Sequence, residues 1–142
     1  HDAIGDEIRN KGHEFGTVTG RARRCGWFDA VIVRYAARVN GLTSLVLNKI
    51  DPLGGLDKLK ICVAYRKDGE LTYDFPPTLE ELALCEPVYE EMDGWSEDIS
   101  NIREFDKLPE NCQKYIKRIE ELCDVRIATI GVGPDREQNI VR

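Results

Sequence analysis

An alternating run of apolar and polar residues in the middle of the chain most tightly constrains its fold. Every second residue from Leu59 to Tyr65 is large and apolar, and a similar alternation runs from Leu71 to Phe75. Between the two runs stands Asp68-Gly69, a pair typical of tight turns between antiparallel strands. The spacing therefore predicts a β-hairpin.

A helix is predicted on each side of this hairpin. Apolar residues at helical spacing follow Asp29 and stop at Gly41. Asp29 suits the start of a helix, and Gly41 suits its end. Because only one face is polar, at Arg34 and Arg38, we expect this helix to be mostly buried. Pro109 opens the second helix. Its apolar stripe consists of Cys112, Tyr115, Ile116, Ile119, Leu122 and Cys123.

Shorter elements are predicted between and after these helices. Residues 42–47 suit a buried strand that ends at Asn48, and residues 125–130 suit a final strand. Thr78 with Glu81 forms a capping box for a short helix that ends near Leu84.

The remaining segments give weaker patterns. Residues 87–95 suit a strand with a turn at Asp93-Gly94, and residues 1–15 suit a short helix or an irregular lead-in. Together the elements predict an α/β or α+β fold, a sheet with helices packed on it.

The charge and cysteine content exclude several classes of function. With 26 acidic and 20 basic residues, the chain lacks the overall positive charge that would attract nucleic acids or anionic membranes. No apolar run approaches the length of a membrane span. The five cysteines include no CxxC pair, which argues against a zinc framework, and their odd number argues against a full disulfide set. We therefore expect reduced thiols and a cytoplasmic location.

A loop rich in glycine, threonine and arginine is the first candidate site. Residues 16–24 read Gly-Thr-Val-Thr-Gly-Arg-Ala-Arg-Arg. Guanidinium groups, hydroxyls and free backbone N–H groups together suit an anion. A solvated basic turn is the alternative, and Gly16 and Gly20 weaken it because glycine lets a backbone approach a ligand closely.

The segment Asn48-Lys49-Ile50-Asp51 matches the N-K-x-D pattern of guanine recognition. In that pattern the Asp carboxylate accepts hydrogen bonds from N1–H and from the exocyclic amine of guanine, and adenine offers no such pair. The Lys stem can lie along the base. The alternative is a charged corner between a strand and a loop. A second strand end, Gly131-Val132-Gly133-Pro134, could expose backbone groups to a base or sugar, or it could be a generic turn.

In order and spacing, these motifs resemble the adenylosuccinate synthetase family. The resemblance rests on residues 14–27 (EFGTVTGRARRCGW), 48–51, 60–66 (KICVAYR), 86–95 (EPVYEEMDGW) and 133–136. It covers nearly the whole chain, so residues 1–142 are expected to be the C-terminal portion of such an enzyme. The implied fold is the α/β C-terminal part of a larger, P-loop-like GTP-dependent ligase with a mixed sheet and a hairpin.

The resemblance implies a reaction and its participants. GTP phosphorylates the 6-oxygen of IMP, and L-aspartate displaces the phosphate to give adenylosuccinate, with Mg²⁺ required and a homodimer expected. The family's phosphate loop, its catalytic residues and its Mg²⁺ site belong to an N-terminal region that this chain lacks. We therefore expect no catalytic or metal-binding residue here and no activity from this portion alone.

The resemblance also implies contacts for individual residues. Arg21 should reach aspartate and IMP, and Arg23 should serve aspartate and the nucleotide. The residues expected to bind aspartate or IMP are Thr17, Val18, Thr19, Gly20, Arg21, Ala22 and Arg23. The residues expected to bind GTP are Arg23, Lys49, Ile50, Asp51, Gly131, Val132, Gly133 and Pro134.

The sequence departs from the family pattern at two positions, and two alternative functions remain to be tested. Val18 stands where the family often has a second threonine, and Gly131 stands where a serine is common. The main alternative is a stand-alone module that binds guanine nucleotides without ligase chemistry. A purely structural or interaction domain is the third.

Overall fold

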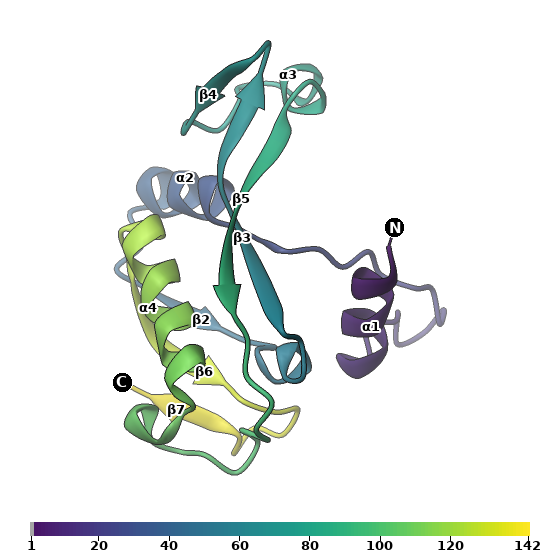
Figure 1. Ribbon diagram of the computed structural model, residues 1–142, viewed down its shortest axis with the longest axis vertical. Helices are drawn as coiled ribbons and strands as arrows, with labels where there is room; N and C mark the ends of the chain where they lie inside the picture. The colour runs from purple at the N-terminus through teal and green to yellow at the C-terminus, as the bar shows by residue number, and fades with distance from the viewer. Residues whose placement is uncertain (1) are drawn as a thin grey trace.

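The computed structural model describes residues 2–142 and arranges them as two small sheets with a long helix between them (Figure 1). In chain order the helices and strands are α1 (Ala3–Lys11), β1 (Phe28–Asp29), α2 (Ala30–Asn40), β2 (Ser44–Leu47), the 3-10 helix η1 (Asp51–Leu53), β3 (Lys58–Lys67), β4 (Glu70–Thr72), α3 (Leu79–Ala83), β5 (Glu86–Asp93), the 3-10 helix η2 (Phe105–Lys107), α4 (Glu110–Cys123), β6 (Arg126–Gly131) and β7 (Asn139–Val141). The predicted α/β class with a mixed sheet and packed helices is confirmed.

The first sheet is built on β3, the longest strand. Antiparallel β5 pairs with it from Lys58 to Arg66, β4 pairs with its last residues, and β1 pairs with it in parallel at Ile61 and Cys62. The predicted hairpin with its turn at 68–69 is confirmed, although its second strand ends at Thr72. The β3–β5 ribbon extends beyond the core and carries β4 and α3 at its far end (Figure 1).

The second sheet has the order β2-β6-β7. Strands β2 and β6 are parallel, with Leu47 opposite Ile130, and β7 is antiparallel to β6. Sequence patterns predicted β2 and β6 but not their pairing, and they did not predict β1 or β7. Because β2 and β6 run in the same direction, the segments that follow them emerge side by side at one edge of the sheet.

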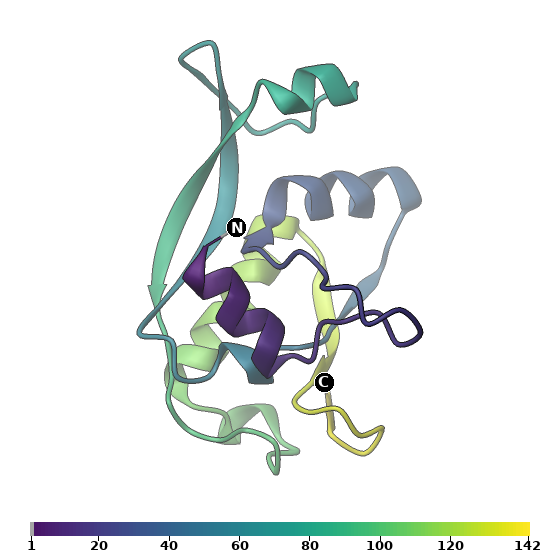
Figure 2. The same ribbon diagram turned by 90° about the vertical axis from the view of Figure 1, so that its right-hand side faces the viewer.

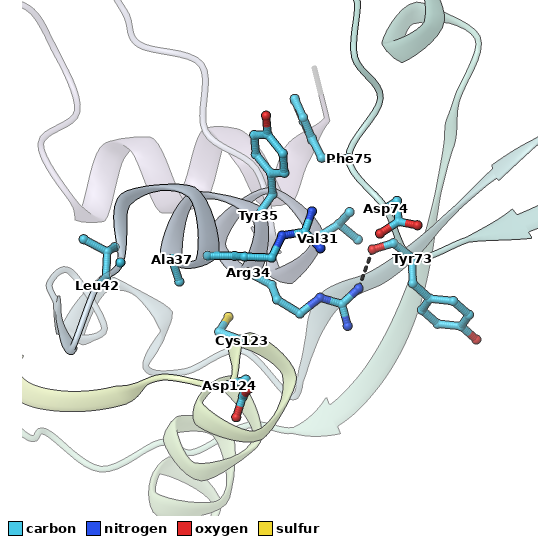
Figure 3. A pocket seen from close by; sticks show the side chains of 12 residues that line it. Val31, Arg34, Tyr35, Ala37, Leu42, Tyr73, Asp74, Phe75, Cys123 and Asp124 are labelled. Carbon is cyan, nitrogen blue, oxygen red and sulfur yellow. Dashed lines mark hydrogen bonds between the residues drawn. The ribbon is translucent and has the colours of Figure 1, made fainter.

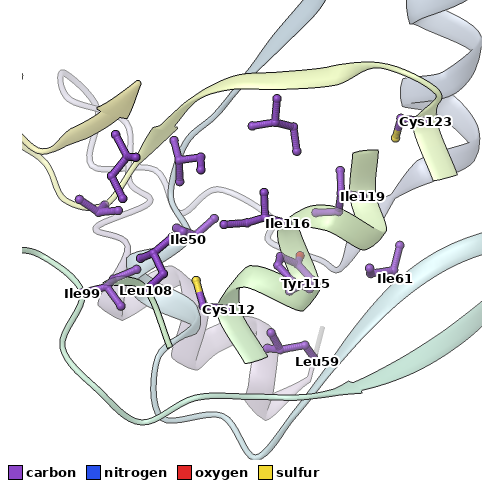
Figure 4. Packing of buried hydrophobic residues seen from close by; sticks show 14 of the residues in the cluster. Ile50, Leu59, Ile61, Ile99, Leu108, Cys112, Tyr115, Ile116, Ile119 and Cys123 are labelled. Carbon is purple, nitrogen blue, oxygen red and sulfur yellow. The ribbon is translucent and has the colours of Figure 1, made fainter. Parts of the chain in front are cut away.

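The core forms around α4, which lies between the two sheets (Figure 4). The predicted stripe is buried at Cys112, Tyr115, Ile116, Ile119 and Cys123. Its neighbours in the same cluster include Leu59 and Ile61 of β3, Ile127 and Ile130 of β6, and Ile140 of β7. Burying such side chains contributes roughly 1.5–3 kcal/mol each, so α4 joins the sheets into one unit.

Helix α2 has the predicted ends but not the predicted burial. The Asp29 carboxylate accepts hydrogen bonds from the backbone N–H groups of Val31 and Ile32, and Gly41 ends the helix with a φ of 62°. Only Ala30, Val31 and Ala37 are buried, whereas the side chains of Ile32, Tyr35 and Val39 are exposed. The expectation of a mostly buried helix is wrong, because α4 and β3 cover only one of its apolar sides.

Strand β2 is also less buried than its sequence indicates. It begins at Ser44 rather than Leu42, and the side chain of Val46 is 62% exposed. Within residues 2–142, β2 pairs with β6 alone, which leaves its other edge open.

Helix α1 confirms that the chain begins with a short helix. The Asp2 carboxylate caps it by accepting a hydrogen bond from the N–H of Gly5 at 2.7 Å. None of its residues is buried, and it stands to one side of the core in Figure 1, so that it lies in front of the core in Figure 2. Its attachment therefore depends on polar contacts rather than on packing.

Candidate functional site

The ends of β2 and β6 form a corner that brings two predicted nucleotide-binding segments together. Residues 48–51 follow β2 and residues 131–134 follow β6. A Cβ atom added to Gly131 would lie 2.6 Å from Oδ1 and 3.4 Å from Cα of Asn48. We name residues 48–51 with 131–134 the strand-end corner. Contact between its halves supports the interpretation of both as parts of one site.

Buried residues hold both halves of the strand-end corner in place. The side chain of Ile50 is 1% exposed and belongs to the main core cluster, and Val132 is fully buried. The N–H of Val132 donates to the carbonyl of Gln138 at 2.9 Å. A Cβ at Gly133 would clash with the side chain of Gln138, at 2.3 Å from its Oε1. The backbone at Gly133 thus requires glycine unless Gln138 moves.

Lys49 and Asp51 lie on either side of the buried Ile50. Lys49 has a φ of 63°, and its Nζ donates to the carbonyl of Gly12 at 2.7 Å. Burial raises the pKa of Asp51, and its own backbone N–H and the charge of Lys49 offset that effect only in part. A half-buried carboxylate that burial disfavours gains from a ligand able to donate two hydrogen bonds.

The loop of residues 16–24, named here the Arg loop, is a closed turn with an exposed tip. The N–H of Gly16 donates to the carbonyl of Arg21 at 2.8 Å, and the N–H of Gly20 donates to the carbonyl of Gly16 at 2.8 Å. Gly20 has a φ of 65°. The side chain of Val18, at the tip, is 97% exposed. The Arg loop therefore presents its threonine and arginine side chains to solvent.

A contact that the sequence patterns did not predict joins the Arg loop to the strand-end corner. The Glu14 carboxylate binds Nη1 of Arg23 through Oε2 at 2.9 Å and Nζ of Lys49 through Oε1 at 3.1 Å. These two hydrogen bonds lower the pKa of Glu14, and the one from Arg23 has the larger effect. Glu14 begins the 14–27 block of the family resemblance, but its two partners are 9 and 35 positions away, so no local pattern predicts these ion pairs.

The last turn of α1 adds two further contacts. Arg9 donates from Nε to the carbonyl of Arg23 at 2.7 Å, and Lys11 donates from Nζ to the carbonyl of Gly54 at 3.0 Å. Helix α1 thus contacts both the end of the Arg loop and the turn that follows Asp51. Its sequence predicted a short helix or an irregular lead-in, but neither of these contacts.

One cavity lies away from these segments. It has a volume of about 490 Å³ and lies between α2, the 73–75 segment and the end of α4 (Figure 3). Its lining includes Arg34, Tyr35, Phe75 and Asp124, and none of the predicted site residues. Within residues 2–142, no three His, Cys, Asp or Glu side chains are grouped so that they could hold a metal ion. In the same range, no helix is long and apolar enough to cross a membrane.

The cysteines take no part in the site. All five lie within residues 2–142, where none forms a disulfide, and Cys62, Cys112 and Cys123 are buried. Burial raises the pKa of these three thiols, to about 11, about 12 and about 11 in turn. Thiols with such pKa values are weak nucleophiles at neutral pH.

Comparison with known proteins gives one consistent result. The family model for adenylosuccinate synthetase matches residues 1–140. Adenylosuccinate synthetase of Acetivibrio thermocellus is 60% identical over 141 residues, which are 99% of this chain and 33% of the relative. The enzyme of Clostridioides difficile is 59% identical over 138 residues, 97% of this chain and 32% of the relative.

The fold gives the same answer. The structure of fully ligated adenylosuccinate synthetase from Plasmodium falciparum superimposes with a TM-score of 0.95 at 43% identity and covers 100% of this chain and 34% of that one. The chain thus spans about a third of the length of the relatives it matches. The strand-end corner, the Arg loop and these matches together establish that the chain belongs to the adenylosuccinate synthetase family.

Proposed function

We propose that this chain supplies the aspartate loop and the guanine site of a GTP-dependent ligase that joins IMP and L-aspartate. The observation that carries the proposal is the contact between the segments at 48–51 and 131–134, with the Arg loop tied to them through Glu14. Two segments that we propose to bind ligands and an arginine-rich loop, all distant in sequence, are thus joined by direct contacts.

In this proposal the strand-end corner binds the guanine base of GTP. The Asp51 carboxylate accepts two hydrogen bonds from guanine, each contributing roughly 1.5–3 kcal/mol. The stem of Lys49 lies along the base, while residues 131–134 flank it from the other side. Adenine offers no matching donor pair, and an unpaired buried carboxylate would reject it.

The Arg loop binds the anionic partners. Arg21 binds the aspartate carboxylate and IMP, and Arg23 serves aspartate and GTP. Thr17 and Thr19 offer hydroxyls, while Val18, Gly20 and Ala22 offer backbone groups. The exposed tip supports this role, because its side chains are free to close on a ligand.

The remaining participants follow from the same proposal. The full-length enzyme would use Mg²⁺ and act as a cytoplasmic homodimer. Residues 2–142 contain no cluster that fits the ion, so we derive no step through Mg²⁺ from this chain. The phosphate loop and the catalytic groups are assigned to a region outside this chain, and the isolated chain is proposed to be inactive.

The direct test measures adenylosuccinate formation by the full-length parent protein with IMP, L-aspartate, GTP and Mg²⁺. We expect product with GTP, little with ATP, and a large rise in the KM for aspartate in Arg21→Ala. Absence of product from the folded wild-type protein would contradict the proposal.

A stand-alone guanine-binding module is the second candidate. It is favoured by the burial of Ile50 and Val132, because these two residues of the chain itself hold the strand-end corner in place. Under this function the isolated chain binds GDP at micromolar concentrations by calorimetry, Asp51→Asn weakens that binding, and the full-length protein makes no adenylosuccinate.

A further inference from the structure

Glu14 is the residue through which the Arg loop and the strand-end corner touch. Its two carboxylate oxygens have different partners, Arg23 at 2.9 Å and Lys49 at 3.1 Å. Both partners are cations proposed to contact ligands, whereas Glu14 is not among the residues expected to bind one. Its position between them points to a role in placing these two side chains.

Burial distinguishes Glu14 from its partners. The side chain of Glu14 is 20% exposed, while those of Arg23 and Lys49 are 57% and 55% exposed. A long cationic side chain in solvent samples many rotamers, and ordering it on ligand binding costs free energy. A shielded carboxylate that already holds both cations reduces that cost.

Backbone contacts fix the geometry around Glu14. The N–H of Arg23 donates to the carbonyl of Glu14 at 2.9 Å, which sets the end of the Arg loop beside the carboxylate. Nζ of Lys49 also donates to the carbonyl of Gly12 at 2.7 Å, two residues before Glu14. The segment from Gly12 to Glu14 therefore engages both cations through more than one contact.

We propose that Glu14 is a positioning residue that links the Arg loop to the strand-end corner and so prepares the aspartate and GTP sites together. The inference rests on the proposed function, because it treats Arg23 and Lys49 as ligand-binding residues. Glu14 acts through these two cations and does not itself touch a substrate.

The test uses the full-length protein and compares wild type with Glu14→Gln. The amide keeps the shape of the side chain but removes the charge that holds both cations. We expect the KM for GTP and the KM for aspartate each to rise by about threefold to tenfold. The melting temperature should stay close to that of wild type, because the ion pairs are partly exposed.

Two variants separate positioning from a merely structural role. Glu14→Asp retains the charge on a shorter side chain, so both KM values should fall between those of wild type and Glu14→Gln. In a double-mutant cycle with Lys49→Met, the two effects on the KM for GTP should be less than additive, because they remove the same contact. Glu110→Gln breaks the exposed pair with Lys114 and serves as the matched control with unchanged KM values.

The inference is overturned if Glu14→Gln leaves either KM at its wild-type value, or if its effect and that of Lys49→Met simply add. A variant that changes both KM values only in proportion to a large loss of melting temperature overturns it as well. These results are distinguishable from failure of the proposed function, in which the wild-type protein itself forms no adenylosuccinate.

Discussion

Gly131 lies against Asn48, so that a Cβ atom at residue 131 would come within 2.6 Å of the Asn48 Oδ1 atom. The contact joins the end of β6 to the first residue of the N-K-x-D segment. Any side chain at residue 131 must therefore displace the amide of Asn48.

Gly131→Ala should change the strand-end corner more than it changes the fold. We expect a loss of about 1 kcal/mol in the free energy of unfolding, because the clash is with a movable amide, and a several-fold rise in the KM for GTP. Gly26→Ala is the control, since a Cβ there would meet nothing within 4 Å. Equal KM values in the two variants would show that the Asn48 contact has no bearing on nucleotide binding.

Asp51→Asn should weaken nucleotide binding without destabilising the protein. The pKa of Asp51 is raised by burial, so the folded state disfavours the charged form. The associated stability is present below the unfolded pKa and is lost as pH rises through the folded pKa. At pH 7 the neutral amide should therefore melt at the same temperature as wild type or higher, while the KM for GTP rises strongly.

Thermal melts and GTP kinetics on the same preparations provide the measurement. Asp57→Asn, at an exposed carboxylate in the next turn, should change neither quantity. A marked fall in the melting temperature of Asp51→Asn would contradict the interpretation that the half-buried Asp51 carboxylate costs stability and serves ligand binding.

Glu90→Gln should destabilise the protein in a manner that depends on pH. Both carboxylate oxygens of Glu90 bind the Arg118 guanidinium at 2.8 Å, and these hydrogen bonds lower the pKa of Glu90. A lowered carboxyl pKa gives stability that is present above the unfolded pKa and lost as pH falls through the folded pKa. We expect a loss of about 1 kcal/mol at pH 7, since the pair is about one-third exposed, and a smaller loss near pH 3.

Denaturant unfolding at several pH values measures this difference. Glu91→Gln, whose contact with Lys60 is longer at 3.6 Å, is the control on the same strand and should have little effect. A Glu90→Gln difference that does not vary with pH would rule out the ion pair as its source.

The cysteines should differ in their rates of modification. Cys25 and Cys85 are partly exposed, whereas Cys62, Cys112 and Cys123 are buried with raised pKa values. Brief treatment with iodoacetamide at pH 8 should therefore label Cys25 and Cys85 first, as mass spectrometry of the digested protein can measure. Labelling of Cys112 at the same rate as Cys85 would contradict the packing around α4.

Val18→Thr should affect aspartate binding alone. The side chain of Val18 is 97% exposed, so the change should leave the melting temperature unaltered. If the tip of the Arg loop closes on aspartate, the added hydroxyl should lower the KM for aspartate and leave the KM for GTP unchanged. An unchanged KM for aspartate would place residue 18 outside the aspartate site.

Short sequence patterns predicted those parts of the fold that depend on neighbouring residues alone. Asp29 and Gly41 fixed the ends of α2, and Asp68-Gly69 fixed the hairpin, because caps and tight turns depend on a few neighbouring residues. The parallel pairing of β2 with β6 joins segments about 80 positions apart, and no local pattern specifies it.

The candidate site was predicted by motif and completed by geometry. The N-K-x-D segment and the Arg loop were recognisable in the sequence because their residue types are specialised for anions and guanine. Glu14 lies in the 14–27 block, but its ion pairs were not predicted, because a single carboxylate has no periodicity or spacing that indicates its partners. Its proposed role depends on two cations that only the folded chain brings to it.

The open edge of β2 has a practical consequence for any work on this chain by itself. Among the described residues 2–142, no strand pairs with this edge, and its backbone groups beside the exposed Val46 form a template for another strand. A preparation of residues 1–142 alone is therefore prone to self-association at the concentrations that calorimetry requires. Light scattering should accompany every binding measurement on it. A substitution that adds a charge to this edge, such as Val46→Lys, would reduce strand addition while leaving the strand-end corner intact.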